Sequence, residues 1–249
     1  MSDQLQSEVP GELVRTARAT PGDRTNLDDQ IYERVRSMIA NRALLPGERI
    51  VPDQLARTMR VSRTPMISAL KRLSQEQLLE WRSRHGVYVR KPTPRELALI
   101  FEVREVLEGL AARRAASVIT PGQIEHLRGL FKDLSTVDSP ANREYYIRQD
   151  YLFHMGLFEI ADSAPLSRSM ATVNIMVMAF AAGLLRPMRD VLDEHEKILD
   201  TLTRRDPADA EGAMRMHINR SVVWLHHAAD TYASAQNRLA RELEYGVRS

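Results

Sequence analysis

Prolines divide the second half of this 249-residue chain into separate stretches of helical periodicity. Proline lacks a backbone N–H and clashes with the preceding turn, so it is tolerated at the start of a helix and breaks its interior. The breaks fall at Thr120-Pro121-Gly122, Ser139-Pro140, Ala164-Pro165, Pro187 and Asp206-Pro207. Six helices are therefore expected, over residues 94–118, 121–137, 140–162, 164–186, 188–204 and 207–244. Since no β-strand pattern interrupts them, an all-α bundle is the predicted fold of this part.

Residues 28–92 contain shorter elements and end in a different period. Helical spacing of apolar residues occurs three times, in stretches that begin near Asp28, after Pro52 and at Ser62, a good N-cap residue. The period then changes to two on both sides of Ser83-Arg84-His85-Gly86, which is typical of a β-hairpin turn. Three short helices followed by a two-stranded hairpin are the elements of a winged helix-turn-helix.

Residues 1–25 are polar and contain two Pro-Gly pairs without any apolar period, so a flexible arm is expected there. Pro92 and Pro94 mark the boundary between the two folded parts. The predicted fold class is thus mainly α: an N-terminal winged helix-turn-helix over residues 26–92, then a C-terminal all-α helical bundle over residues 93–249.

Charge is unevenly distributed between these parts, although the chain as a whole carries only +2. Residues 28–92 hold thirteen Lys and Arg against seven Asp and Glu, whereas residues 93–249 hold nineteen against twenty-two. The basic excess predicts a polyanionic partner for the first part alone. A solvated basic face is the alternative explanation of the same excess.

The composition also bears on the compartment. The chain has no cysteine, which excludes disulfides, thiolate metal sites and cysteine nucleophiles and fits a reducing environment. No basic segment followed by an apolar stretch opens the sequence, and the most apolar run, residues 175–185, is too short to cross a bilayer. We therefore expect a cytoplasmic protein with no membrane partner.

The third short helix is the expected DNA-reading element. A helix of this kind enters the major groove and presents its first turn, here Arg63 and Thr64, to base edges. The hairpin turn, Arg84-His85-Gly86, is suited to the adjacent minor groove or backbone. Four further basic residues are placed to reach flanking phosphates: Arg57, Arg60, Lys71 and Arg72.

Residues 45–89 resemble the N-terminal domain of the GntR family of repressors. The matching features are Pro46-Gly47, Leu55-Ala56, Val61-Ser62-Arg63-Thr64-Pro65, Ala69-Leu70, Leu73 and His85-Gly86. A generic helical domain with a basic face does not require so many features in register. The resemblance implies a winged helix that binds double-stranded operator DNA.

Two positions depart from the family pattern. Ile67-Ser68 stands where the family usually has Arg-Glu, and Gln77 replaces the family's glycine near the end of the helix. Ile67 removes one expected DNA contact and offers an apolar contact to a thymine methyl group instead. The full set of predicted DNA-contacting residues is Arg57, Arg60, Ser62, Arg63, Thr64, Ile67, Lys71, Arg72, Arg84, His85 and Gly86.

A spaced polar set lies on otherwise apolar faces of the helical part. Asp150 and His154 are one helical turn apart and therefore project from the same side of a helix, while His195 and His217 lie on two later helices. One carboxylate and three imidazoles converging in a bundle core suit a divalent ion such as Zn²⁺, Ni²⁺ or Mn²⁺. Any one of these histidines alone is more simply explained as a hydrogen-bonded core residue.

Together these four residues resemble the metal-binding set of the FadR subgroup of GntR proteins. The stretches over residues 103–116 and 194–217 also match its C-terminal FCD domain, and six helices favour the VanR-like variant over the seven-helix one. Some members lack the metal set and bind fatty acyl groups. Because this chain retains all four positions, the resemblance implies a small organic or aromatic acid whose carboxylate reaches the metal.

Four polar residues are candidates for contacting that acid: Arg104, Asn174, Arg148 and Arg186. The family often places an arginine at the position of Arg104, where a bidentate pair with a carboxylate can form. An ion pair of Arg104 with Glu108 or Glu105 is the alternative. Asn174 is the only polar side chain in its stretch, and it suits either the effector or a buried carbonyl.

The predicted function is that of a DNA-binding transcriptional regulator, a repressor, that responds to a small acid. Two chains would pair through their helical domains as a homodimer and place two winged helices on a palindromic operator. One alternative is a metal-dependent hydrolase or isomerase that uses the same Asp and His residues, although the sequence offers no separate general acid or base for it. Another alternative is a regulator that senses the metal ion itself.

Overall fold

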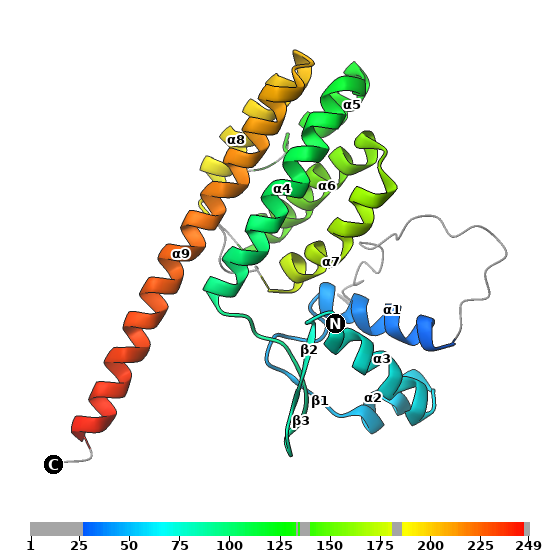
Figure 1. Cartoon of the computed structure of the whole chain (residues 1–249), viewed down its shortest axis with the longest axis vertical. Coiled ribbons are helices and arrows are strands. Elements are labelled where there is room, and N and C mark those ends of the chain that lie inside the picture. The colour runs from blue at the N-terminus through cyan, green and yellow to red at the C-terminus, as the bar shows by residue number, and fades with distance from the viewer. Residues whose placement is uncertain (1–26, 133, 135–139, 181–185, 247–249) are drawn as a thin grey trace, which may run out of the picture. The chain divides into compact units, whose positions relative to one another are not determined.

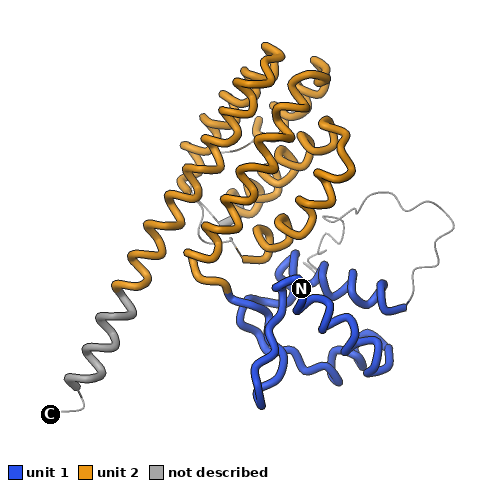
Figure 2. The backbone as a smooth tube through the Cα atoms, viewed as in Figure 1, with its two compact units in different colours: residues 1–91 blue, residues 92–249 orange. Residues whose placement is uncertain are grey.

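The computed structural model describes residues 27–132, 134, 140–180 and 186–246. The chain divides into two compact units, an N-terminal unit of residues 1–91 and a C-terminal unit of residues 92–249 (Figure 2). The arm expected over residues 1–25 lies outside the described residues. No helix in the described part is long and apolar enough to cross a membrane.

Three helices form the core of the N-terminal unit: α1 (Leu27–Ala40), α2 (Pro52–Met59) and α3 (Arg63–Gln75). The apolar stripes expected from the sequence are the buried faces, and α1 packs on α3. Arg60 ends α2 in a left-handed conformation, which makes the tight turn into α3. Ser62 occupies the N-cap of α3 through its extended backbone, but its side chain makes no capping hydrogen bond.

A three-stranded antiparallel sheet completes the N-terminal unit. The expected hairpin is formed by β2 (Leu79–Arg82) and β3 (Gly86–Val89), with Gly86 at a φ of +101° that favours glycine. The sequence analysis missed β1 (Arg49–Ile50), which pairs with β3 and gives the strand order β1-β3-β2. A two-residue strand is too short to show a hydrophobic period, so no sequence pattern predicts it.

The C-terminal unit is helical throughout its described residues (Figure 1). Its helices are α4 (Pro94–Val118), α5 (Pro121–Gly129), α6 (Pro140–Ala161), α7 (Ala164–Phe180), α8 (Met188–Thr203) and α9 (Pro207–Gly246). Proline occupies the first turn of most of them, as predicted, and capping boxes begin α4 at Thr93 and α5 at Thr120. The prediction for the second helix was wrong at its end, because α5 stops at Gly129 and not at residue 137. The fourth helix, expected to reach residue 186, is described as far as Phe180, and residues 181–185 lie outside the described part.

Helix α4 is the centre of this unit, with α6, α7, α8 and α9 packed around it. Small buried side chains on its surface, Ala111, Ala112, Ala115 and Ala116, allow close approach of its neighbours. Gly109 lies where α4 meets α9, since a Cβ atom there would come within 2.7 Å of Arg215 Cγ. This close packing fixes where the polar side chains of α6, α8 and α9 meet α4.

We predict that Thr120→Ala destabilises the protein by about 1 kcal/mol, because the Thr120 side chain accepts a hydrogen bond from the backbone of Gln123 at the start of α5. Urea unfolding followed by circular dichroism measures this change. Thr203→Ala is the matched control, since that hydroxyl bonds only the Leu199 carbonyl inside a helix and its loss is expected to be neutral. Equal destabilisation by the two changes would contradict the capping role.

Candidate functional site

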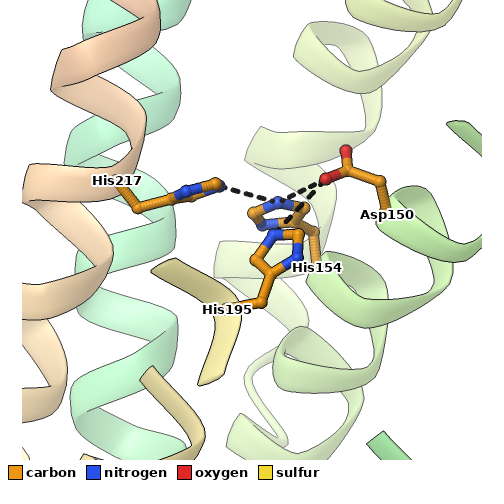
Figure 3. A group of neighbouring side chains, drawn as sticks. All are labelled: Asp150, His154, His195 and His217. Atoms are coloured by element: carbon orange, nitrogen blue, oxygen red, sulfur yellow. Dashed lines mark hydrogen bonds and ion pairs between the residues drawn. The ribbon is translucent and has the colours of Figure 1, made fainter. Parts of the chain in front are cut away.

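Four ionisable side chains of the C-terminal unit converge at one point (Figure 3). Asp150 and His154 come from one face of α6, His195 from α8 and His217 from α9. Each offers one ligand atom, and these atoms all lie within 4.8 Å of one another. The structure thus brings together the four residues that the spacing singled out. We call them the Asp-His cluster.

The three histidines of the cluster are buried, Asp150 is partly exposed, and their polar atoms face one another. Asp150 Oδ1 lies 3.6 Å from His154 Nε2 and 3.4 Å from His195 Nε2, and the Nε2 atoms of His154 and His217 are 3.4 Å apart. All three histidines are almost completely removed from solvent. Burial alone raises the pKa of Asp150, but the adjacent His154 outweighs burial and holds that pKa well below its usual range. The carboxylate is therefore ionised and able to bind a cation.

His195 has an unusual environment. Its side chain is 1% exposed, yet neither ring nitrogen has a hydrogen-bond partner among the described residues. The ring is held by aromatic contacts instead, stacking on Phe131 with centroids 4.7 Å apart and meeting Phe153 at 4.4 Å. Burial, together with nearby His217, lowers the pKa of His195 well below its usual value. A neutral, buried imidazole with an unused lone pair is what a metal ligand requires.

The donor set therefore fits a divalent ion. Three imidazole nitrogens and one carboxylate oxygen are the ligands that Zn²⁺, Ni²⁺ and Mn²⁺ accept, and their mutual distances allow one ion to contact all four. A buried imidazole that makes no hydrogen bond costs free energy unless a ligand binds its nitrogen. Both observations favour a metal site over a purely structural polar core.

Two buried carboxylates stand directly behind the cluster, and the sequence analysis did not assign them to it. Glu108 of α4 contacts His154 Nδ1, and Glu194 of α8 accepts a hydrogen bond from His217 Nδ1 at 2.9 Å. Burial alone would raise the pKa of Glu108, but the adjacent Arg104 and His154 outweigh burial and lower that pKa from its usual value to about 2. The available signal was weak: Glu194 immediately precedes His195, and Glu108 lies one turn after Arg104.

A cavity of about 80 Å³ adjoins the cluster. Asp150, His154 and His217 form one side of it, and its remaining polar lining includes three of the predicted effector contacts: Arg104, Asn174 and Arg186. Apolar side chains, among them those of Phe101, Val177, Met178 and Val191, supply the rest. The cavity is small, and cationic groups line it together with possible metal ligands.

The four effector candidates differ in what they contact. Arg104 makes the ion pair with Glu108, not Glu105, and lines the cavity as well, so both of its proposed roles are compatible. Asn174 donates to Met155 Sδ at 2.7 Å, and Arg186 pairs with Glu194 at 2.6 Å. Arg148 is exposed and does not line the cavity, because it lies on the far side of α6 from Asp150.

The predicted DNA-contacting residues all lie in the N-terminal unit and are exposed or half-exposed. Arg63 begins α3 and forms only an exposed ion pair with Asp53 at 3.3 Å. Arg72 is engaged within the unit, since its guanidinium pairs with Asp29 at 2.7 Å and lies 3.7 Å from the centre of the Tyr32 ring. Arg72 therefore links α1 to α3, and a phosphate would compete with these contacts.

Comparisons with known proteins agree with this architecture. Residues 27–89 match the bacterial regulatory proteins of the gntR family, and residues 99–220 match the FCD domain. The chain is 29% identical over 197 residues to a probable D-xylose utilization operon transcriptional repressor of Paenarthrobacter nicotinovorans, covering 78% of this chain and 87% of that one. It is 27% identical over 197 residues to the HTH-type transcriptional repressor RspR of Escherichia coli K12, covering 77% and 86%.

A solved structure supports the fold. E. coli McbR/YncC superposes with a TM-score of 0.64 at 20% sequence identity, covering 81% of this chain and 98% of that one. The chain belongs to the GntR family of transcriptional regulators and carries an FCD domain after its winged helix-turn-helix. Its relatives are DNA-binding regulators and not enzymes, so the hydrolase or isomerase alternative is set aside.

We predict that Arg104→Met destabilises the C-terminal unit by about 3 to 5 kcal/mol, because it leaves the Glu108 carboxylate buried without its cationic partner. Arg113→Met is the matched control on the same helix: its ion pair with Glu211 is 59% exposed on the arginine side, so less than about 1 kcal/mol is expected. Chemical denaturation measures both. Similar losses for the two variants would contradict the assigned burial of the Arg104 pair.

Proposed function

We propose that this GntR-family regulator is a repressor whose binding to operator DNA responds to a small organic acid in a metal-containing cavity. The observation that carries the proposal is the Asp-His cluster, whose buried His195 makes no hydrogen bond among the described residues, beside a cavity lined by arginines. Two relatives are named as repressors, which supports that direction of control.

Asp150, His154, His195 and His217 would hold the ion, with Zn²⁺ favoured and Ni²⁺ or Mn²⁺ as alternatives. A bound ion supplies a positive centre that attracts a carboxylate. Three of the four ligand residues also line the cavity, so an acid there lies beside the metal position. The tight packing of His195 between Phe131 and Phe153 keeps its ring in place.

The other half of the acid's binding site would come from Arg104 and Arg186. A guanidinium is always charged and matches a carboxylate with two parallel hydrogen bonds. Both arginines line the cavity from elements other than α6, and Asn174 adds an amide. The cavity volume of about 80 Å³ suits a small acid better than a long acyl chain.

On the DNA side, we propose that two chains form a homodimer and place two α3 helices on a palindromic operator. Acid binding would favour one arrangement of the dimer over the other. The difference in operator affinity between two such states is typically a few kcal/mol at most.

We predict that Arg63→Ala weakens binding to operator DNA by about 1 to 3 kcal/mol, since Arg63 opens the DNA-reading helix and is held only by an exposed ion pair. A gel-shift titration with DNA from upstream of the protein's own gene and neighbouring operons measures this. Arg34→Ala is the control, because Arg34 is an exposed residue of α1 outside the predicted contact set. Equal affinities for the Arg63 and Arg34 variants would exclude this orientation of α3.

We predict that small organic and aromatic acids raise the thermal midpoint of the zinc-loaded protein and that a chelator abolishes the effect. His195→Ala should abolish it too, whereas His226→Ala, an exposed histidine of α9, should preserve it. Gel shifts with the same acids then report release from DNA. If chelation alone releases DNA and no acid does, the protein is a metal sensor, and the acid part of the proposal is wrong.

A further inference from the structure

Two series of contacts between charged residues connect the cavity wall to the Asp-His cluster, and we call each series a contact chain. In each contact chain an arginine that lines the cavity contacts a glutamate, and that glutamate contacts one cluster histidine. The two contact chains come from different helices and reach different histidines. Among the described residues, His195 has no such support.

The first contact chain is completely buried. Arg104 Nε and His154 Nδ1 both contact the Glu108 carboxylate, in close ion pairs with its two different oxygens. The three side chains are between 1% and 8% exposed. Glu108 therefore has no solvent to compensate it, and its charge is shared between the arginine and the histidine.

The second contact chain has the same order with an added partner. Arg186 donates to both oxygens of Glu194, at 2.6 and 2.8 Å, and His217 Nδ1 lies 2.9 Å from Glu194 Oε2. Arg220, which does not line the cavity, donates to Glu194 Oε1 at 2.6 Å from the exposed side. Glu194 thus keeps one cation if Arg186 turns away.

Hydrogen-bond chemistry fixes what each glutamate does. An ionised carboxylate only accepts, so Nδ1 of His217, which is hydrogen-bonded to Glu194, must carry the proton. The same holds for Nδ1 of His154, because its close contact with Glu108 would otherwise place a lone pair against a carboxylate, although that contact lacks hydrogen-bond geometry. The Nε2 atom is then the coordinating one, and the Nε2 atoms of His154 and His217 are the atoms that face each other inside the cluster. Carboxylates behind metal-binding histidines orient the ring and increase its basicity.

We propose that Glu108 and Glu194 are positioning residues that present His154 and His217 to the metal through Nε2 and that make metal affinity depend on Arg104 and Arg186. An anion that draws an arginine into the cavity leaves its glutamate more strongly bound to the histidine, and the metal is held more tightly. By reciprocity, the metal raises the affinity for the anion. This inference rests on the proposed metal centre.

The first test uses Ni²⁺ alone, added to the full-length protein in calorimetric titrations. Glu108→Gln and Glu194→Gln are each expected to weaken Ni²⁺ binding by about 10- to 100-fold. Glu211→Gln is the control: Glu211 lies on α9 outside the cluster, and the change removes the same charge from its ion pairs with Arg113 of α4 and Arg215 of α9, so affinity should change less than twofold. Unchanged Ni²⁺ affinity in both the Glu108→Gln and the Glu194→Gln variant would overturn the proposal.

Nitrogen-15 spectra of the histidine side chains give a readout that a general loss of stability does not mimic. In the metal-free wild type, His217 should carry its proton on Nδ1, and Glu194→Gln should redistribute it between the two nitrogens. A wild-type proton on Nε2 would overturn the assigned role of Glu194. If the wild type binds no Ni²⁺ at all, the proposed metal centre fails, while this measurement still decides how His217 is held.

A double-mutant cycle tests the link to the cavity. Arg186→Gln should tighten Ni²⁺ binding several-fold in the wild-type background and less than twofold in the Glu194→Gln background. The same fold-change in both backgrounds would mean that the arginine acts on the ion through space, and the contact chain would be refuted. The Arg186 cycle is preferred to an Arg104 cycle because Arg220 still compensates Glu194, which protects the fold.

Discussion

The C-terminal unit is organised by the burial of charge in a bundle of helices. Arg104, Glu108, Glu194 and the three cluster histidines are all nearly inaccessible to solvent. A buried ionised group is tolerated only when a partner compensates it, and removing that partner is far more costly than the pair is favourable. Because the partners come from α4, α6, α8 and α9, these buried ion pairs tie the four helices to one another.

The sequence predicted the fold where local chemistry decides it. Proline and capping threonines mark helix starts such as those of α4 and α5, because the first turn has backbone N–H groups without partners. Helix ends were less predictable. Residues 130–137 continue the apolar spacing, yet α5 stops at Gly129, since glycine weakens a helix wherever packing does not restore it. Strand β1 forms only because β3 offers it a partner, which is information that no local pattern contains.

The sequence predicted the four residues of the Asp-His cluster but not the carboxylates behind them. The spacing of Asp150 and His154 predicts that they share one face of a helix. Nothing in the sequence distinguishes Glu108 and Glu194 from ordinary surface glutamates, whereas in the structure both are buried beside histidines. Basic residues were equally ambiguous. Arg104 of α4 and Arg148 of α6 are both helical arginines. Only the packing of each helix determines that Arg104 lines the cavity and that Arg148 is exposed. Spacing identifies the donors, and tertiary contacts identify what orients them.

The distribution of partners within the Asp-His cluster has a consequence for how a ligand signal would travel. His154 and His217 are each tied through a glutamate to an arginine of the cavity, while His195 is held by the rings of Phe131 and Phe153. A ligand in the cavity could therefore act on α6 through Glu108 and on α9 through Glu194, and the second of these contacts begins on α8, one residue before His195. In the proposed function, a change at the cavity arginines would thus reach α6, α8 and α9 together through buried carboxylates, which is the kind of coupling that shifts packed helices against one another.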